Sequence, residues 1–216
     1  MSDSAVLIVG AGGHAAVVAD ALLAAGVRVL GFVDPDITRH GRLLCGLPVL
    51  GDDAVLAQHS PATLQLANGI GGTRGEGLRR EVQRRLEAHG WLFAQVRHPS
   101  AVVSPFARVA AGSQLFANCV VQAGAVVSEG CIVNSAAVVE HDVVLGDYVH
   151  VSCNATVCGS AHIGAYSHVG AAAVVRQGVQ LGETTVVGAG AVVVRDFPGG
   201  ATLVGAPAEP MKKRTP

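Results

Sequence analysis

Residues 121–145 read VQAGAVVSEGCIVNSAAVVEHDVVL, and every sixth residue of this stretch, starting at Val121, is aliphatic. The same phase runs from Val103 to Val193, over sixteen consecutive positions without a slip. A period of six fits neither a helix of 3.6 residues per turn nor an alternating strand. It is typical of a parallel β-helix made of hexapeptide repeats, in which each repeat forms one short side and a turn.

Three such repeats make one coil, so residues eighteen apart should stack at about 4.8 Å, the strand spacing of a sheet. Each aliphatic residue is expected to point into the prism, and the mostly small residue two places before it lets the chain bend. The alternative, a chance run of valines in a β-sandwich, would lose phase over this length. The repeat does not determine the handedness of the coils, although right-handed crossovers are the general rule for parallel strands.

The composition suits many thin, closely stacked strands. Half of the 216 residues are hydrophobic but only 4% are aromatic, and there are 28 glycines. A formal net charge of -1 gives no field that would attract nucleic acid or an anionic membrane. The short apolar run near the start has no basic segment before it, and five cysteines include no CxxC pair. We therefore expect a cytoplasmic protein with reduced thiols.

The first 97 residues show strand and helix patterns in place of the repeat. This alternation predicts a small open parallel sheet. We expect a Rossmann-like half domain over residues 1–97 and a β-helix domain with a C-terminal extension over residues 98–216. The expected strands are 5–10, 28–34, 64–67 and 91–96, and the expected helices are 15–25 and 77–89.

Residues 10–15, GAGGHA, satisfy the G-x-G-x-x-A form of the dinucleotide fingerprint, and Asp34 ends the second expected strand. Glycines let backbone N–H groups approach a phosphate at a helix start, and Asp34 could accept a hydrogen bond from a ribose hydroxyl. One alternative is a tight turn that needs glycine for packing only. A nicotinamide dehydrogenase is disfavoured, because only half of its fold would fit before the repeat begins.

Charge is concentrated at one turn of the repeat. Only nine residues from Ala101 to Asp196 are Asp, Glu, Lys or Arg, and two of them, Glu140 and Asp142, flank His141. One coil before and after His141 stand Ala123 and Gly159, which leave room for the imidazole to project outward. A neighbouring carboxylate holds one ring nitrogen as N–H, which makes the other nitrogen a better base. The alternative is a solvated polar corner.

Three further histidines, His150, His162 and His168, occupy outward positions of their repeats. Such histidines suit a subunit interface, a ligand groove or a metal site. Their spacing differs from that of the zinc-binding hexapeptide trimers of the gamma-class carbonic anhydrases, so no metal is expected. A prism with flat, valine-rich faces is too apolar to stay wet, which predicts a homotrimer.

Four motifs occur in an order that resembles one family. They are IVGAGGHA near the start, VRHPSAVVSP at entry to the coils, NSAAVVEHDVVLGDYVHVS in the middle and VGAPAEPM near the end. The chain resembles, over almost its whole length, the sugar-nucleotide N-acetyltransferases of the bacillosamine and perosamine type. The resemblance implies a left-handed β-helix trimer with active sites between subunits. Acetyl-CoA would lie along the coils and the sugar nucleotide on the N-terminal domain.

The resemblance also implies roles for individual residues. The histidine of its EH motif is the proton acceptor and matches His141, and the acid that raises its basicity matches Asp142, with Glu140 as the other candidate. A second histidine near the thioester matches His150. The donor's pantetheine arm is expected at backbone amides of Gly170, Ala171, Gly188 and Ala189.

The sugar nucleotide is expected at the N-terminal turn. Pro35 departs from a second acidic residue found in some members, which puts contacts to the base or ribose in doubt. The residues expected on this side are Gly12, Gly13, His14, Asp34, Pro35, Gly71 and Asn118.

The predicted reaction moves acetyl from acetyl-CoA to the 4-amino group of a nucleotide-linked 4-amino-4,6-dideoxysugar, GDP-perosamine or a UDP-linked analogue. The amine attacks the thioester directly in a ternary complex, with His141 as general base. No cysteine carrier is expected, because no cysteine adjoins a histidine or an acid in the turns. Two alternatives stay open: O-acetylation of a sugar hydroxyl, as in sialic-acid O-acetyltransferases, and a non-catalytic β-helix binding module.

Overall fold

The computed structural model describes residues 5–72 and 76–211. The chain divides into two compact units, Met1–Pro99 and Ser100–Pro216. Within the described ranges, no helix combines the length and the apolar character needed to cross a bilayer.

The N-terminal unit is built on a sheet with strand order β3-β4-β2-β1-β5, in which only β3 and β4 run antiparallel. The apolar strand β1 is buried along its whole length, as expected for a parallel strand covered on both faces. Helix α1 buries Ala15, Val18 and Leu22. The bounds are β1 (Ala5–Val9), α1 (Gly13–Ala24), β2 (Val29–Val33), η1 (Ile37–Arg39), β3 (Leu43–Leu44), β4 (Leu47–Gly51), η2 (Asp53–Gln58), β5 (Leu64–Asn68), α2 (Glu76–Ala88) and β6 (Val96–Arg97).

The prediction of a strand over residues 91–96 is wrong. Phe93 forms only an isolated parallel bridge to Leu66, and β6 begins at Val96. Trp91 and Phe93 are buried in the core of this unit, so their apolar character serves packing and not a strand. The hairpin β3–β4 was not predicted, because β3 has two residues and its turn places Cys45 in the left-handed region with φ 51.

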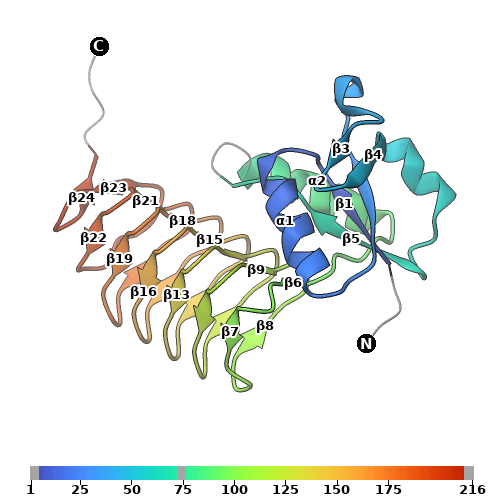
Figure 1. Cartoon of the computed structure of the whole chain (residues 1–216). Helices are drawn as coiled ribbons and strands as arrows, with labels where there is room; N and C mark the ends of the chain where they lie inside the picture. Colours follow the sequence, from blue (N-terminus) through green and yellow to red (C-terminus); the bar gives the residue numbers. More distant parts are fainter. Residues whose placement is uncertain (1–4, 73–75, 212–216) are drawn as a thin grey trace, which may run out of the picture. The chain divides into compact units, whose positions relative to one another are not determined.

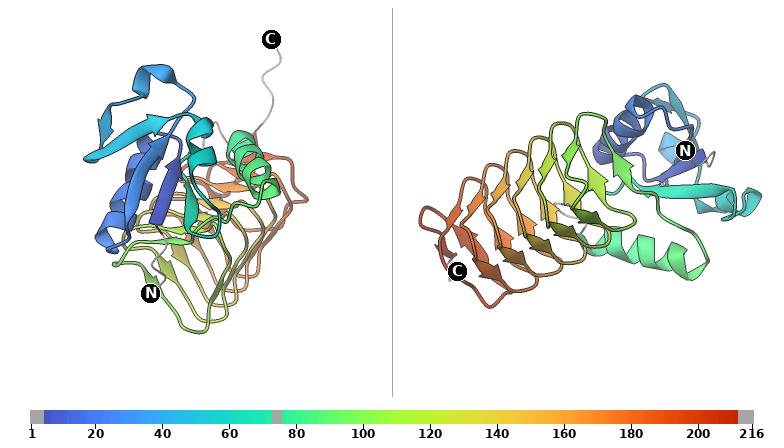
Figure 2. Two further views of the ribbon diagram at one scale, coloured as in Figure 1. Left: turned by 90° about the vertical axis from the view of Figure 1, so that its right-hand side faces the viewer. Right: turned by 90° about the horizontal axis from the view of Figure 1, so that it is seen from below.

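The second unit is a left-handed parallel β-helix whose coils stack one upon another (Figures 1 and 2). Its three faces are named here by the strands that form them. The first face contains β7 (Val102–Val103), β10 (Val120–Val121), β13 (Val138–Val139), β16 (Thr156–Val157), β19 (Val174–Val175) and β22 (Val192–Val193). The second contains β8 (Arg108–Val109), β11 (Val126–Val127), β14 (Val144–Leu145), β17 (His162–Ile163) and β20 (Gln180–Leu181). The third contains β9 (Gln114–Leu115), β12 (Ile132–Val133), β15 (His150–Val151), β18 (His168–Val169) and β21 (Val186–Val187), extended by β23 (Thr202–Val204) and β24 (Glu209–Pro210).

The register confirms the coil of eighteen residues: Val121 pairs with Val139, and Val139 with Val157. The predicted core is confirmed as well. Fourteen of the sixteen aliphatic positions are buried, and Val103 and Val109, at the entry, are partly buried and pack against the core. Burying a Val or Leu side chain stabilises the fold by about 1.5–3 kcal/mol, so the repeat carries the stability of this unit.

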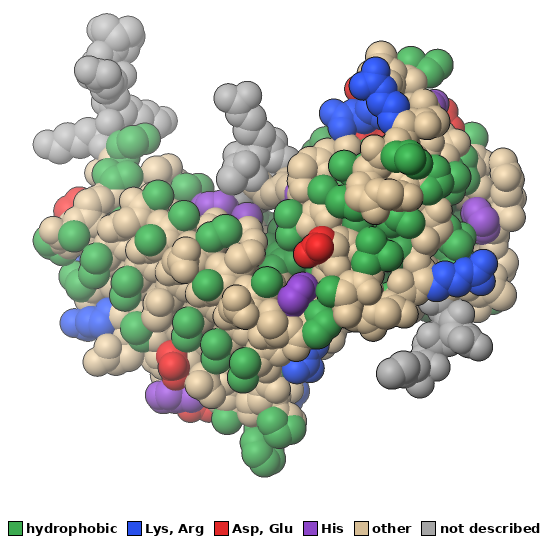
Figure 3. Space-filling view, in the orientation of Figure 1, with side chains coloured by type: hydrophobic (Ala, Val, Ile, Leu, Met, Phe, Trp, Pro, Cys, Tyr) green, Lys and Arg blue, Asp and Glu red, His purple; other side chains and the backbone are tan. Residues whose placement is uncertain are grey.

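The chain turns at three corners in every coil. The first corner joins the first face to the second, the second corner joins the second face to the third, and the third corner leads back to the first face. Most corners use one residue in the left-handed region, such as Asp142 with φ 58 in the first corner and Tyr148 with φ 56 in the second. On the side seen in Figure 3, the coils present mainly hydrophobic and uncharged side chains.

Candidate active site

The turn Glu140-His141-Asp142 lies in the first corner, directly after β13. The Nδ1–H of His141 donates to the Asp142 carboxylate, with 3.0 Å between Nδ1 and Oδ2. The two side chains are 62% and 66% exposed. Because a carboxylate only accepts, this bond places the proton of a neutral imidazole on Nδ1 and leaves Nε2 as an acceptor. Among the described residues, Nε2 has no hydrogen-bond partner.

Two glycines form the bed of this turn. A Cβ on Gly159, one coil after His141, would lie 2.6 Å from Cε1 of the imidazole and closer still to Nε2. A Cβ on Gly124 would overlap the Asp142 carboxylate in the same way. The ring and its carboxylate thus rest on backbone, in space that a side chain at either glycine would take.

The other acid of the turn, Glu140, interacts with the backbone and with Cys158 and not with the imidazole. One carboxylate oxygen of Glu140 accepts from the backbone N–H of His141, at 3.3 Å. Cys158 stands one coil further along, because Val139 pairs with Val157. Burial raises the pKa of the Cys158 thiol, and the negative charge of Glu140 raises it further. The thiol is therefore held protonated, which argues against a role as a covalent acetyl carrier.

His150 lies on the third face, with only 5% of its surface exposed. Its strand neighbour Val151 points into the core, so His150 points outward, as predicted. The His150 side chain is nevertheless buried. Its Nε2 is 3.3 Å from the amide nitrogen of Asn134. Since the amide oxygen of Asn134 accepts from the Ser135 N–H at 2.8 Å, the nitrogen faces the ring and donates to Nε2.

Sequence reasoning missed Asn134. The coil frame could have found it, because Asn134 follows Ile132 and Val133, which pair with His150 and Val151. The polar row continues along the third face. His168 stacks edge-on to His150 with 4.8 Å between ring centroids, and its Nε2 is 3.1 Å from the Ser152 hydroxyl.

The four expected donor-binding residues line the third corner of later coils. A Cβ on Gly170 would lie 2.6 Å from the Val187 carbonyl oxygen, so glycine is required there by stacking. A Cβ on Gly188 would meet the Val204 side chain at 3.0 Å, which is a tight contact. Ala171 and Ala189 are exposed. In the described part of the chain, their backbone N–H groups donate to no other group, which leaves two donors eighteen residues apart along one edge.

A single chain does not bring all the expected groups of the coils together. His141 occupies the first corner, whereas Ala171 and Ala189 occupy the third corner, with His150 beside it. The whole first face lies between the two corners. Asn118 also lies in the third corner, where its φ of 58 explains an asparagine by backbone conformation, and its N–H donates to the Ser100 hydroxyl at 3.0 Å.

The N-terminal turn shows two kinds of glycine. Gly10 needs a φ of +96, and a Cβ on Gly69 would lie 2.7 Å from the Ala15 Cβ. At Gly12 and Gly13, by contrast, an added Cβ meets no described atom within 4 Å, and neither φ is left-handed. Packing therefore does not explain these two glycines. Gly71 lies beside His14, since its Cβ would be 3.2 Å from that of His14.

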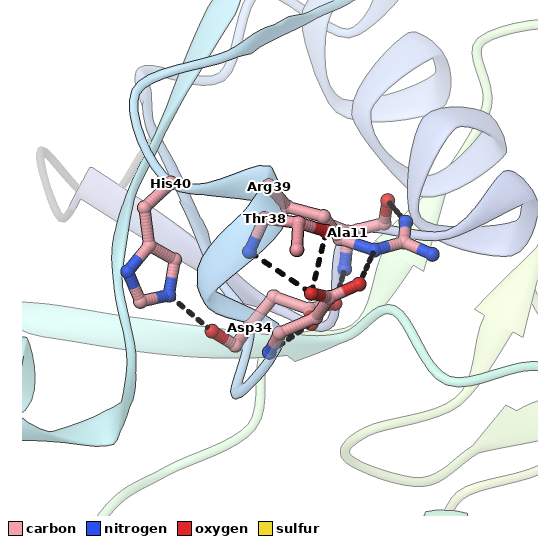
Figure 4. Close-up of polar contacts among 6 residues, drawn as sticks. Ala11, Asp34, Thr38, Arg39 and His40 are labelled. Atoms are coloured by element: carbon pink, nitrogen blue, oxygen red, sulfur yellow. Dashed lines mark hydrogen bonds and ion pairs between the residues drawn. The ribbon is translucent and has the colours of Figure 1, made fainter.

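The carboxylate of Asp34 stabilises this turn by accepting hydrogen bonds from the backbone (Figure 4). Its carboxylate accepts from the Ala11 N–H at 2.7 Å and from the Asp36 N–H at 2.9 Å, with the exposed Pro35 between the two acids. Arg39 donates to the Ala11 carbonyl at 2.5 Å. Hydrogen bonds from Thr38 and then Arg39 lower the pKa of the Asp36 carboxyl. Asp34 thus shapes the turn, and its remaining lone pairs stay available to a ribose.

The described residues hold no group of three or more His, Cys, Asp or Glu side chains that could bind a metal ion. His150 and His168 meet as a ring pair, and His162 lies on a different face. The polar groups that the structure does assemble are a histidine–carboxylate turn, an edge of backbone donors and a glycine turn at a helix start.

Comparisons with known proteins agree with these features. The PglD N-terminal domain model matches residues 5–86. A perosamine N-acetyltransferase from Caulobacter crescentus, a histidine-to-asparagine variant in complex with CoA and GDP-perosamine, is 36% identical, with coverage of 97% of this chain and 98% of that chain and a TM-score of 0.90. The acetyltransferase domain of PglB from Neisseria gonorrhoeae, in complex with acetyl coenzyme A, is 38% identical, with coverage of 95% and 98% and a TM-score of 0.88. The comparison with curated proteins gave no match.

The fold, the turn and these relatives together define an acyltransferase of the hexapeptide-repeat class that uses acetyl-CoA. Within this class, the chain belongs to the family of sugar N-acetyltransferases.

Proposed function

We propose that this protein transfers an acetyl group from acetyl-CoA to the 4-amino group of a nucleotide-linked 4-amino-4,6-dideoxysugar, GDP-perosamine or a UDP-linked analogue. The observation that carries the proposal is the exposed His141–Asp142 pair resting on Gly159, with Nε2 as an unbonded acceptor on an exposed side chain. Relatives at 36% and 38% identity carry CoA with GDP-perosamine in one case and acetyl coenzyme A in the other.

The reaction needs one base and no covalent intermediate. The neutral amine attacks the thioester carbonyl carbon, a C–N bond forms, and the C–S bond breaks to release the CoA thiolate. Nε2 of His141 takes the proton that the nitrogen loses and passes it to the thiolate, while Asp142 stabilises the imidazolium that forms between these steps. The raised pKa of Cys158 keeps the nearby thiol from competing as a nucleophile.

We expect the working unit to be a homotrimer with each active site between two subunits. The separation of His141 from the edge of His150, Ala171 and Ala189 supports this arrangement. A neighbouring prism that lays its third corner against the first corner of this chain would complete one site. The two free N–H donors along that edge suit the amide carbonyls of a pantetheine arm. One further backbone donor at the oxyanion would contribute about 10²–10³ in turnover.

The sugar nucleotide is assigned to the N-terminal turn. Gly12 and Gly13 stand at the start of α1, which spans twelve residues and has no acidic side chain in its first turn. Backbone N–H groups at a helix start bind phosphate well, and the absence of side chains lets a diphosphate approach them. Because the described cysteines are free thiols, we expect the protein to work in the cytoplasm.

The test is release of free thiol from acetyl-CoA in the presence of a panel of GDP- and UDP-linked 4-amino sugars and their 4-hydroxy counterparts. N-acetylation predicts thiol release with an amino sugar, with mass spectrometry showing one added acetyl. Thiol release with the hydroxy sugars alone would make the protein an O-acetyltransferase. Binding of the ligands with no thiol release from any acceptor would leave only a binding module.

A further inference from the structure

A cavity of about 350 Å³ opens beside the glycine turn of the N-terminal unit. Its wall includes Ala11, which directly precedes Gly12 and Gly13, and continues over η1 to the hairpin β3–β4. The cavity lies at the carboxyl ends of β1 and β2, where open α/β sheets bind their ligands. A nucleotide whose diphosphate lies on the glycines would therefore have its nucleoside at this cavity.

Two arginines line the cavity, and they differ in their partners. Arg39 is fixed by the Ala11 carbonyl and by the Asp36 carboxylate, the latter at 3.1 Å. Arg42 contributes its backbone to two hydrogen bonds, but within residues 5–72 and 76–211 its guanidinium has neither a hydrogen bond nor an ion pair. A guanidinium presents five donors in a planar fork that suits a pair of acceptors. Arg42 is thus an exposed donor group at the cavity, and it bonds neither the Asp36 carboxylate, which Thr38 and Arg39 engage, nor the Thr38 hydroxyl.

Asp36 and Thr38 add polar groups to the wall, where Asp36 accepts from Thr38 and pairs with Arg39. The remaining side chains of the wall are apolar. Leu43 lines the cavity although it is 71% exposed, and Val49 forms a buried part of the wall. An exposed leucine next to a planar guanidinium suits a flat heteroaromatic ring, which can pack on the leucine and leave its edge for hydrogen bonding. The cavity thus combines apolar side chains with a donor fork and with the engaged polar groups of Asp36 and Thr38.

We infer that this cavity takes the base of the sugar nucleotide and that Arg42 selects guanine. The O6 and N7 atoms of guanine are two adjacent acceptors that match the arginine fork. Adenine places an amino donor where guanine has O6, and uracil offers no second acceptor in that position. This inference rests on the proposed function and adds to it the identity of the nucleoside, so the acceptor becomes a GDP-linked amino sugar.

The experiment is calorimetry on the full-length protein with GDP, IDP, ADP, UDP and CoA. IDP keeps O6 and N7 and lacks only the 2-amino group, so GDP and IDP should bind alike, with ADP and UDP roughly tenfold or more weaker. In Arg42→Ala the affinities for GDP and IDP should fall to that of ADP, while ADP, UDP and CoA are unchanged. Arg42→Lys keeps the charge but loses the fork, and it should lose the preference for GDP as well.

Arg28→Ala removes an exposed arginine outside the cavity and should bind all five ligands like the parent protein. Equal affinity of the parent protein for UDP and GDP would overturn the inference, and so would an equal loss of all four diphosphates in Arg42→Ala, which would make Arg42 a phosphate contact. A selective loss of CoA would assign the cavity to the donor. In each of these cases, thiol release from acetyl-CoA with UDP-linked acceptors would show that the protein is still an acetyltransferase. No thiol release with any acceptor would contradict the proposed function itself.

Discussion

In the N-terminal unit, Gly12 and Gly13 stand where an added Cβ meets no described atom within 4 Å, whereas in the β-helix Gly124 and Gly159 lie directly against the side chains of Asp142 and His141. The coil glycines are explained by their neighbours in the chain. The turn glycines have no such neighbour, which supports the proposal that a ligand approaches them. The absence of a side chain thus has opposite causes in the two units, and substitutions can test each cause.

The largest effect on turnover is expected from substitution of His141, whose imidazole rests on Gly159. His141→Asn should lower turnover by about 10²–10⁴, because it removes a general base. The fold should stay intact and the melting temperature should barely move, since the side chain is exposed and packs in no core. Steady-state kinetics with acetyl-CoA and a 4-amino sugar nucleotide measure the loss. His162→Asn, an exposed histidine on the second face, is the matched control; full turnover in a folded His141→Asn protein would contradict the general-base assignment.

A methyl group added at Gly159 should give the next largest effect on turnover. In Gly159→Ala the imidazole has to move away from the new Cβ, and a displacement of this kind costs about 10- to 100-fold in turnover. Stability should change little, because the ring is the exposed end of a flexible side chain. A double-mutant cycle checks the cause: Gly159→Ala should cost nothing further in a His141→Asn background. An additive loss would mean that Gly159 acts through something other than the imidazole.

Substitution of Gly13, where an added Cβ meets no described atom, should change substrate affinity and not the rate of acetyl transfer. Gly13→Val displaces no atom of the described chain, but it puts a branched side chain where a diphosphate would approach the helix start. We expect the sugar nucleotide to bind about tenfold or more weakly, with acetyl-CoA affinity unchanged. Gly77→Val, an open glycine of α2, is the control. Calorimetry with each ligand separately decides, and a selective loss of acetyl-CoA would exchange the two sites.

A smaller effect is expected from the carboxylate that orients the ring. Asp142→Asn should lower turnover by about fivefold or less, because exposed ion pairs contribute only about 0–1 kcal/mol. Glu140→Gln should cost less again, since Glu140 bonds a backbone N–H and not the imidazole. Kinetics of the two variants side by side rank them. A larger loss for Glu140→Gln would show that the wrong carboxylate has been assigned.

The smallest effect concerns Cys158. Its raised pKa means that less thiolate is present at a given pH, so alkylation should be slow and should speed up only as the pH rises through that higher value. Glu140→Gln removes one cause and leaves burial, the larger cause, so the rate curve should shift modestly toward lower pH. Iodoacetamide labelling followed by mass spectrometry measures this. The exposed Cys45, in the other unit, should label at the same rate in both proteins.

How far the sequence predicted these features depends on the region. In the coils, each residue meets the residue eighteen positions away, so the core, the register and the glycine bed of His141 could all be predicted by counting. The same counting pairs Asn134 with Ser152, two residues from His150, so it would have placed Asn134 near His150, had it been applied to polar residues. It could not show that His150 is buried, because exposure depends on what covers a face and not on the repeat.

The N-terminal unit has no such period. Its glycine turn was predicted from a motif, but the contacts of Asp34 to Ala11 and Asp36 depend on loop conformation that no pattern encodes. Strand 91–96 was wrongly predicted because Trp91 and Phe93 are apolar for packing reasons. The cavity of Arg42 arises from a hairpin whose first strand has two residues, which is too short to leave a pattern.

The eighteen-residue register also limits how the gene for such a chain can change. The backbone N–H groups of the coil strands bond to the neighbouring coil, for example from Glu140, directly after β13, to Val157 at 3.0 Å and from Cys158, directly after β16, to Val175 at 3.0 Å. Losing a single codon between β13 and β16 would turn every later valine out of the core. Duplicating a whole coil would leave all partners in phase and would move Ala189 away from His150 by one strand spacing, about 4.8 Å. Evolution can therefore lengthen the distance between the edge that binds the acetyl donor and the catalytic histidine only in steps of one whole coil.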